Sequence, residues 1–289
     1  MAINLTTQYK DKVAERFKAG SKTDKGAGHD YEFIGAKTIV VYSVDVVDTV
    51  NYDRTVGEDN ATGGFRFGKI NELGDTKQEL TVTQDKAFTF SIDAGNSAQQ
   101  LNIKQANKCL KRQWDEKCTP EIDAYRLASW VAGKGLTGSN AITVSKDGQL
   151  TEKTIVAAIF GAGAQMSDDL VPVAGRTLYI PELTFVKFRL ADVVMGADAI
   201  SAENIQRGYR GTIDGMDVVT VPSKIFPEGY NFIIKYKNAT VDPVQLKNLR
   251  VQKNPIGIDG DVVEGRYIYD SFVLNSKCKG VYASSTATT

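Results

Sequence analysis

The longest helix-compatible run in the chain extends from residue 96 to residue 135. Apolar side chains recur at helical spacing in both halves of the run, first at Ile103, Ala106, Leu110 and Trp114 and then at Ala124, Leu127, Ala128 and Val131. Pro120 lies between the halves. A proline inside an unbroken helix costs about 3 kcal/mol, so we expect a kink or a restart there, with Thr119 as the cap. About 40 helical residues make a rod of roughly 60 Å, which predicts a flat, extended subunit.

The composition excludes several classes of protein. The 289 residues are 42% hydrophobic, and Lys plus Arg balance Asp plus Glu at 35 each. An even balance gives no basic field that could grip nucleic acid over the whole surface. The spacing of the three cysteines argues against a disulfide framework or a zinc site. The chain shows no apolar leader and no run of 18 apolar residues, so we expect a soluble protein made in a cytoplasm, without a membrane partner.

The segments before the long helix predict an arm, a strand and a hairpin. A short amphipathic helix in a mildly basic arm is indicated by apolar residues four apart, namely Leu5, Tyr9, Val13 and Phe17. A flexible link at residues 21–30 follows, and then a β-branched and aromatic strand at residues 37–52. Residues 57–92 alternate around Gly74 and Asp75, which predicts a long hairpin. Because a two-stranded hairpin is marginal alone, we expect a neighbouring subunit to cover its apolar residues, such as Phe65, Phe67, Leu80 and Val82.

A Gly-rich connection near Gly135 predicts the start of a second, α+β unit. This unit is expected to contain a helix, a strand with a Pro-marked turn into a helix, a Gly-rich hairpin and a buried strand, over residues 151–170, 175–188, 208–222 and 230–240. The tail from Val241 returns to short strands whose alternation suits the sheet of residues 37–52. The second unit is then inserted into a discontinuous first one.

No group of residues stands out for catalysis or for binding a cofactor or a metal. Residues 63–69 fit the GxxxxGK spacing of a phosphate-binding loop, but Ile70 stands where Ser or Thr must hold magnesium. His29 is the only histidine, which leaves little basis for nucleophilic or metal-assisted catalysis. Acidic pairs at residues 168–169 and at residues 259 and 261 are typical of solvated turns. We therefore expect no enzyme activity and no cofactor.

The order of these elements resembles that of the major capsid protein of tailed bacteriophages, the HK97 fold. Four stretches are similar to parts of that family: TKQELTVTQDKAFTFSID (76–93) to the E-loop strand, PEIDAYR (120–126) to the spine helix, GRTLYIP (175–181) to the axial (A) domain, and YDSFVLNSKCKGVY (269–282) to the closing strands of the peripheral (P) domain. The resemblance covers nearly the whole chain. It implies an α+β, HK97-like fold with an N-terminal arm at 1–35, an E-loop at 57–92, an A domain at 137–240, and a P domain made of 36–56, 93–136 with the spine helix, and 241–289.

The resemblance also implies a structural function. Subunits of this family form pentamers and hexamers that tile an icosahedral shell around double-stranded DNA, so the implied location is the virion, after assembly in the host bacterial cytoplasm. The implied partners are other copies of the chain, a separate scaffolding protein, a portal protein, in some shells a decoration protein, and packaged DNA through weak, non-specific contacts. Contacts between subunits would use Tyr9, Val13 and Phe17 of the arm together with the four hairpin residues.

Two alternatives stay open at this point. An encapsulin-type compartment shares the fold but encloses a cargo enzyme instead of DNA. A tail-tube or surface-binding protein is the other class, and the long helix argues against it.

Overall fold

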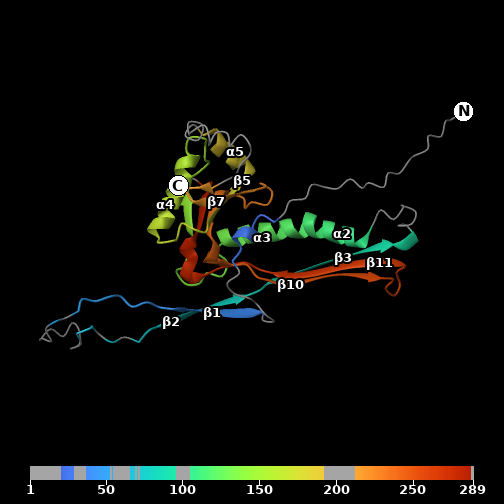
Figure 1. Cartoon of the computed structure of the whole chain (residues 1–289), viewed down its shortest axis with the longest axis horizontal. Coiled ribbons are helices and arrows are strands. Elements are labelled where there is room, and N and C mark those ends of the chain that lie inside the picture. Colours follow the sequence, from blue (N-terminus) through green and yellow to red (C-terminus); the bar gives the residue numbers. More distant parts are fainter. Residues whose placement is uncertain are drawn as a thin grey trace.

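The computed structural model describes residues 21–28, 37–52, 54, 66–68, 70, 72–95, 105–191 and 212–287. The chain is extended and combines helices with four small sheets. A long helix lies along a three-stranded sheet, a six-stranded sheet with two helices stands at one end of it, and a two-stranded ribbon projects away from both (Figure 1). This arrangement leaves much of the ribbon without cover from the rest of the chain.

The long helix is described from Ala106 to Val131 in three consecutive segments. These are α2 (Ala106–Gln113), the π-helical turn η3 (Trp114–Cys118) and α3 (Thr119–Val131). In the π turn the backbone N–H of Thr119 donates to the carbonyl of Trp114, five residues back. Pro120 then occupies the first turn of α3, where its missing N–H costs least. The helix does not restart at Pro120, because Cys118 and Thr119 both have helical φ and ψ angles, and Thr119 therefore does not cap a new helix.

The three-stranded sheet beneath the long helix is made of β3 (Gln84–Asp93), β11 (Gly260–Tyr269) and β10 (Val244–Lys253), all antiparallel with β11 in the centre. Tyr267 and Tyr269 of β11 meet the helix edge to face, each with a ring centroid 5.4 Å from Trp114 and Tyr125 respectively. The expectation that the tail strands pair with residues 37–52 is wrong, because β10 and β11 form their sheet with β3. The apolar alternation of β3 fits the face that the helix covers.

The ribbon consists of β1 (Thr38–Val44) and β2 (Asp75–Thr81), paired antiparallel with Thr38 opposite Thr81. The hairpin predicted across Gly74 and Asp75 is therefore wrong, since Asp75 begins a strand whose partner is β1, and β3 belongs to another sheet. The strand predicted over residues 37–52 is also shorter, and ends at Val44.

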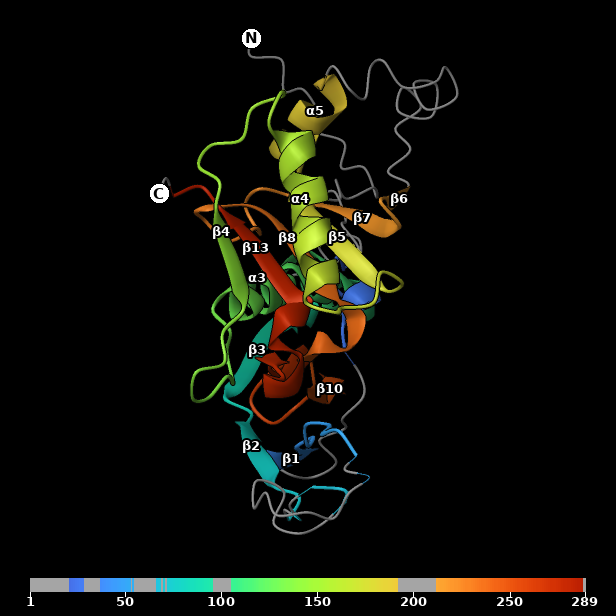
Figure 2. The same cartoon turned by 90° about the vertical axis from the view of Figure 1, so that its left-hand side faces the viewer.

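The six-stranded sheet has the order β4 (Thr143–Lys146), β13 (Val281–Ser285), β8 (Tyr230–Tyr236), β5 (Arg176–Pro181), β7 (Met216–Val221) and β6 (Thr212–Ile213). One face packs against α4 (Ile155–Asp168) and α5 (Glu182–Leu190), seen in front of and above the sheet in Figure 2. The other face packs against Leu127 and Trp130 of α3. All six residues of β5 are buried, and Pro181 ends the strand where α5 begins, as predicted.

The last strand, β13, differs from expectation. It pairs with β4 and β8 in the six-stranded sheet and not with the strands of the first unit. Val281 and Ala283 are buried against α3, so β13 fastens the second unit to the long helix. Short elements complete the described fold, namely η1 (Asp24–Gly26), η4 (Lys237–Ala239), β9 (Thr240–Val241), β12 (Phe272–Val273) and η5 (Asn275–Gly280).

Candidate assembly surface

The β1–β2 ribbon rests on the body of the chain through one of its two faces. Ile39 and Val41 of β1 and Leu80 of β2 point to this inner face, because successive residues of a strand point to opposite sides. They pack with a buried apolar cluster on the body, made of Val82, Val241, Phe272 and Leu274. The inner face is thus part of the core of the chain itself.

The outer face of the ribbon carries an uncovered apolar row. Val40, Tyr42 and Val44 of β1 are all exposed, with Tyr42 66% accessible. Their cross-strand partners on β2 are charged, since Tyr42 lies opposite Lys77 and Val44 opposite Asp75. An apolar row bordered by charges is typical of a surface that another protein covers.

Exposed apolar side chains also follow β1 along the chain. Tyr52 and Phe67 meet edge to face with ring centroids 5.0 Å apart, and Phe67 remains 83% exposed. Isolated exposed apolar side chains are ordinary, whereas many of them along one projecting segment indicate an interaction site. We call this set the arm surface, and it comprises Val40, Tyr42, Val44, Val46, Val47, Val50, Tyr52, Phe67, Ile70 and Leu73.

A buried glutamine ties the ribbon to the body. Gln78 of β2 is 5% exposed, and its Nε2 donates to the carbonyls of Gly135, at 2.7 Å, and of Val273, at 2.9 Å. Its Oε1 accepts from the backbone N–H of Asn275 at 2.9 Å. One side chain therefore joins β2 to the end of the long helix and to the segment after β12.

A second anchor forms around the buried carboxylate of Asp270, where β2 gives way to β3. Asp270 accepts from both the N–H and the hydroxyl of Thr83, at 2.8 and 3.0 Å, and from Tyr125 Oη at 2.9 Å. Lys134 Nζ lies 2.5 Å from Asp270 Oδ1. Burial alone would lower the pKa of Lys134, but its hydrogen bonds to Asp270 and Tyr125 hold that pKa above its ordinary value. The lysine thus stays charged at the base of the ribbon.

Two smaller exposed apolar groups lie on other parts of the chain. Leu183, Val186 and Leu190 form a stripe on the outer side of α5. Ile256 and Ile258 lie in the turn between β10 and β11, and both are exposed. The arm surface is larger than either group.

The structure separates the residues that the sequence proposed for contacts between subunits. Tyr9, Val13, Phe17 and Phe65 lie outside the described residues. Phe67 is on the arm surface. Leu80 and Val82 are only 1% and 4% exposed and belong to the core under the ribbon, which leaves them little area for a neighbouring subunit.

Val40, Tyr42 and Val44 were not among the contact residues predicted from the sequence. Their alternation along residues 37–52 was visible, but nothing in it distinguished the exposed face from the buried one.

The residues weighed for other chemistry do not converge. Among the described residues, no group of three or more His, Cys, Asp or Glu side chains could hold a metal. Asp168 and Asp169 lie exposed at the end of α4, and none of the three cysteines forms a disulfide. His29 and most of the GxxxxGK stretch lie outside the described part of the chain. Among the helices that the structure describes, none is long and apolar enough to cross a membrane.

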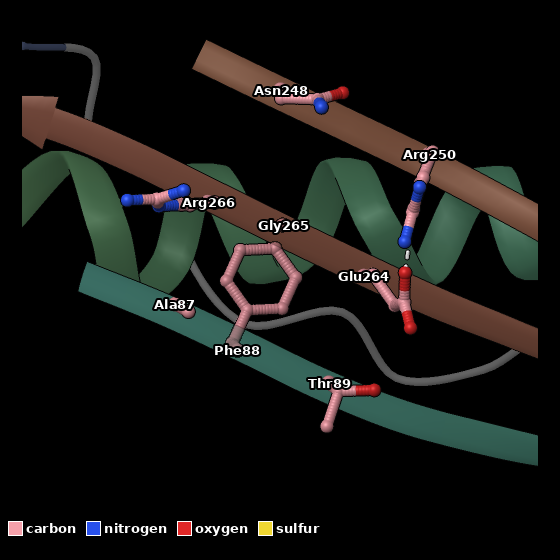
Figure 3. Close-up of a pocket in the computed structure, with 8 residues that line it drawn as sticks. All are labelled: Ala87, Phe88, Thr89, Asn248, Arg250, Glu264, Gly265 and Arg266. Atoms are coloured by element: carbon pink, nitrogen blue, oxygen red, sulfur yellow. Dashed lines mark hydrogen bonds and ion pairs between the residues drawn. The ribbon is translucent and has the colours of Figure 1, made fainter. Parts of the chain in front are cut away.

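The face of the three-stranded sheet turned away from the long helix has a hollow of about 460 Å³ (Figure 3). Two arginines line it, and carboxylates of the same sheet hold both. Arg250 Nε lies 2.6 Å from Glu264 Oε2, and Arg266 binds Asp85 through two hydrogen bonds of 3.0 and 2.6 Å. The hydrogen bond from Arg266 lowers the pKa of Asp85. Because these charges neutralise one another, the hollow lacks the character of an anion site.

Comparisons with known proteins identify structures that have a similar fold. No protein-family model matches the chain, and no curated protein matches it. Solved structures do. A structure from Mycobacterium phage Che8 has a TM-score of 0.76 at 17% identity, covering 99% of this chain and 98% of the other. The capsid structure of Cyanophage P-SCSP1u has a TM-score of 0.74 at 14% identity, with coverages of 98% and 93%.

A third structure, the mature capsid of bacteriophage PhiM1, has a TM-score of 0.71 at 12% identity, with coverages of 98% and 92%. In all three the match extends over nearly the full length of both chains, so it includes the ribbon, the long helix and the six-stranded sheet together. The chain therefore has the fold of phage capsid proteins.

Proposed function

We propose that this chain is the major capsid protein of a tailed phage, a non-enzymatic subunit that assembles through pentamers and hexamers into an icosahedral shell around double-stranded DNA. The observation that carries the proposal is the near-complete match to capsid structures at TM-scores of 0.71 and 0.74. The arm surface supports it, because an apolar row of this extent on a projecting ribbon requires a partner. The place of action is the virion.

The proposal includes an HK97-like division of the chain. The long helix and the three-stranded sheet would be the spine and the P domain, and the six-stranded sheet with α4 and α5 would be the A domain. The E-loop would be the ribbon of β1 and β2 with the residues between them, so it would begin earlier in the chain than residue 57. Strand β13 would belong to the A-domain sheet, although it lies in the tail.

The proposed partners follow from this function. Other copies of the chain would cover the arm surface. A separate scaffolding protein, a portal protein and, in some shells, a decoration protein would join the assembly. Contact with DNA would be weak and non-specific, because a chain with equal numbers of acidic and basic residues lacks the excess positive charge that binds phosphates tightly.

The test uses a charge placed on the arm surface. The substitution Tyr42→Asp should leave the unassembled chain folded, because Tyr42 is exposed and faces Lys77 across the strand pair. It should prevent closed shells, because the carboxylate would have to be buried at the contact between subunits. Leu170→Asp is the matched control, since Leu170 is exposed, apolar and outside the arm surface.

Both variants and the parent chain would be co-expressed with a scaffolding protein and viewed by negative-stain electron microscopy, with circular dichroism to verify folding. Closed shells for the parent and for Leu170→Asp, with none for Tyr42→Asp, are the expected result. Shells of normal size from Tyr42→Asp would refute the role of the arm surface. Particles of the parent that package a protein cargo and never nucleic acid would instead favour an encapsulin-type compartment.

A further inference from the structure

The segment Ser21 to Gly28, here called the strap, is buried at four of its residues although its sequence predicts a flexible link. It lies between α3 and the strands β8 and β9, and Thr23, Gly26, Ala27 and Gly28 are all buried. A Cβ on Gly26 would lie 2.0 Å from the hydroxyl of Tyr179, and one on Gly28 would lie 1.7 Å from the carbonyl oxygen of Thr240. The strap therefore occupies a slot that has room for backbone alone at these two positions.

Two charged residues of α3 hold one half of the strap. Asp123 accepts hydrogen bonds from the Ser21 hydroxyl at 2.8 Å, the Lys22 N–H at 2.7 Å and the Thr23 hydroxyl at 2.6 Å. Arg126 donates to Thr23 Oγ1 at 3.1 Å and to Asp24 Oδ1 at 2.6 Å. These contacts are all polar.

Two charged residues, Lys235 of β8 and Asp242 after β9, hold the other half. Lys235 Nζ donates to the carbonyl of Gly26 at 2.6 Å. The N–H of Gly28 donates to Asp242 Oδ2 at 3.0 Å, and the N–H of Asp242 donates to the Gly28 carbonyl at 3.1 Å. The strap thus bridges the long helix and the six-stranded sheet.

Many contacts of the junction, the region where α3 packs on the six-stranded sheet around Lys235 and Asp242, do not involve the strap. Asp242 bonds Lys235, Trp130 Nε1 and the hydroxyls of Thr240 and Ser271. Lys235 also lies 4.0 Å above the ring of Trp130. A core cluster that contains no strap residue joins α3 to the sheet, and its members include Leu127, Trp130, Tyr179, Ile233 and Val281. The strap itself has one apolar side chain, that of Ala27.

We propose that the strap is a releasable clasp, which opens as a unit while α3 and the six-stranded sheet stay folded. Its departure exchanges polar contacts for water and withdraws only one apolar side chain, that of Ala27, from the core, so it takes much less free energy than unfolding of the junction. The chain then has a closed state, with the strap seated between α3 and the six-stranded sheet, and an open state, with a hydrated polar slot.

Hydrogen exchange on the unassembled full chain tests the clasp independently of shell formation. The amides of Gly26, Ala27 and Gly28 should exchange at least 100-fold faster than those of β8, and with weaker dependence on denaturant. Thr23→Val, which removes the hydroxyl between Asp123 and Arg126, should speed exchange in the strap about tenfold and leave α3 and β8 unchanged. Thr220→Val is the matched control, because Thr220 is a buried threonine that donates to Glu182 far along the sequence from the strap.

A harsher variant gives a second test. Gly28→Ala should abolish protection of the strap amides, because the methyl group cannot fit beside Thr240, while the parent pattern of protection in α3 and β8 persists. The proposal would be overturned if the strap amides of the parent exchanged hydrogen only together with those of β8. It would also be overturned if α3 and β8 unfolded in the Gly28→Ala variant.

Discussion

Replacing Gln78 by methionine tests how the ribbon is fastened to the body. Methionine matches the length of glutamine and keeps a buried, flexible side chain, so the packing volume changes little. The substitution removes the side-chain amide. This amide donates hydrogen bonds to the carbonyls of Gly135 and Val273 and accepts one from the N–H of Asn275. Three backbone groups would lose this partner at once.

The cost can be worked from the burial of those groups. A buried hydrogen-bonding group left without a partner costs about 1–3 kcal/mol. Val273 is fully buried, so its carbonyl should carry most of that cost. Gly135 and Asn275 are half-buried, and their backbone groups can turn partly to water. The free energy of unfolding should therefore fall by about 2–4 kcal/mol.

Urea unfolding followed by circular dichroism measures this change, with the slope against urea concentration compared between variants. Gln84→Met is the control, because the Nε2 of Gln84 reaches only the Thr83 hydroxyl at 3.5 Å, and its stability should stay within about 0.5 kcal/mol of the parent. Hydrogen exchange should also rise in β1 and β2 of the Gln78→Met chain. If Gln78→Met were as stable as Gln84→Met, the glutamine could not be the fastening that its contacts indicate.

Two further predictions concern the sheet and the junction. Gly265→Ala should destabilise the chain by about 1–3 kcal/mol, because the new methyl would lie 2.4 Å from the ring of Phe88, and thermal unfolding against a surface Ser91→Ala control would measure it. Asp242→Asn should destabilise it by about 3–5 kcal/mol at pH 7, because Lys235 would lose its buried counter-charge. Burial would raise the pKa of Asp242, but the charges of Lys235 and Arg126 and hydrogen bonds from the junction hold it at about 2, below the ordinary 3.8. A lowered carboxyl pKa stabilises the folded state at pH values above the ordinary pKa. The difference in free energy of unfolding between the parent and Asp242→Asn should therefore shrink as the pH falls from 4 to 2. A gap that stayed constant over this range in urea titrations would contradict the assignment.

Elements of the fold that depend on local pattern could be predicted from the sequence. The segment TLYI before Pro181 indicated a strand, and the proline marked the change to helix at Glu182. The helical spacing on either side of Pro120 indicated the long helix. The π turn ahead of Pro120 could not be foreseen, because nothing in the residue types there distinguishes it from a regular turn.

Pairing between strands could not be predicted, because alternation identifies a strand but not its neighbour. Asp75 follows a glycine, which suggested a turn, yet β2 pairs back to β1 across about 30 residues. The alternation in β3 is equally strong, and it is satisfied by β11, more than 160 residues later. Such long-range partners are decided by which surfaces fit when the chain folds.

The candidate surface depends on a still finer distinction, the parity of residues along one strand. Leu80 and Val41 face the core, and Tyr42, one position further, faces outward. A shift of one residue exchanges the two faces of a strand. Because β1 has apolar residues on both faces, its sequence does not indicate which face is buried. The strap was misjudged for a different reason. Its glycines and polar residues look like a flexible link, and only the distant Asp123 and Asp242 give them a fixed place.

The open side of β1 has a consequence for handling the protein. In the part of the chain that the structure describes, β1 pairs with β2 alone, so its other edge presents unpaired backbone groups. The strand TIVVYSV has no charge and no proline to block further pairing. Segments of this kind nucleate amyloid-like stacking at high concentration. The yield of usable protein should therefore depend on how quickly a correct partner covers β1. Purification at low protein concentration should give a higher yield than refolding from a concentrated stock.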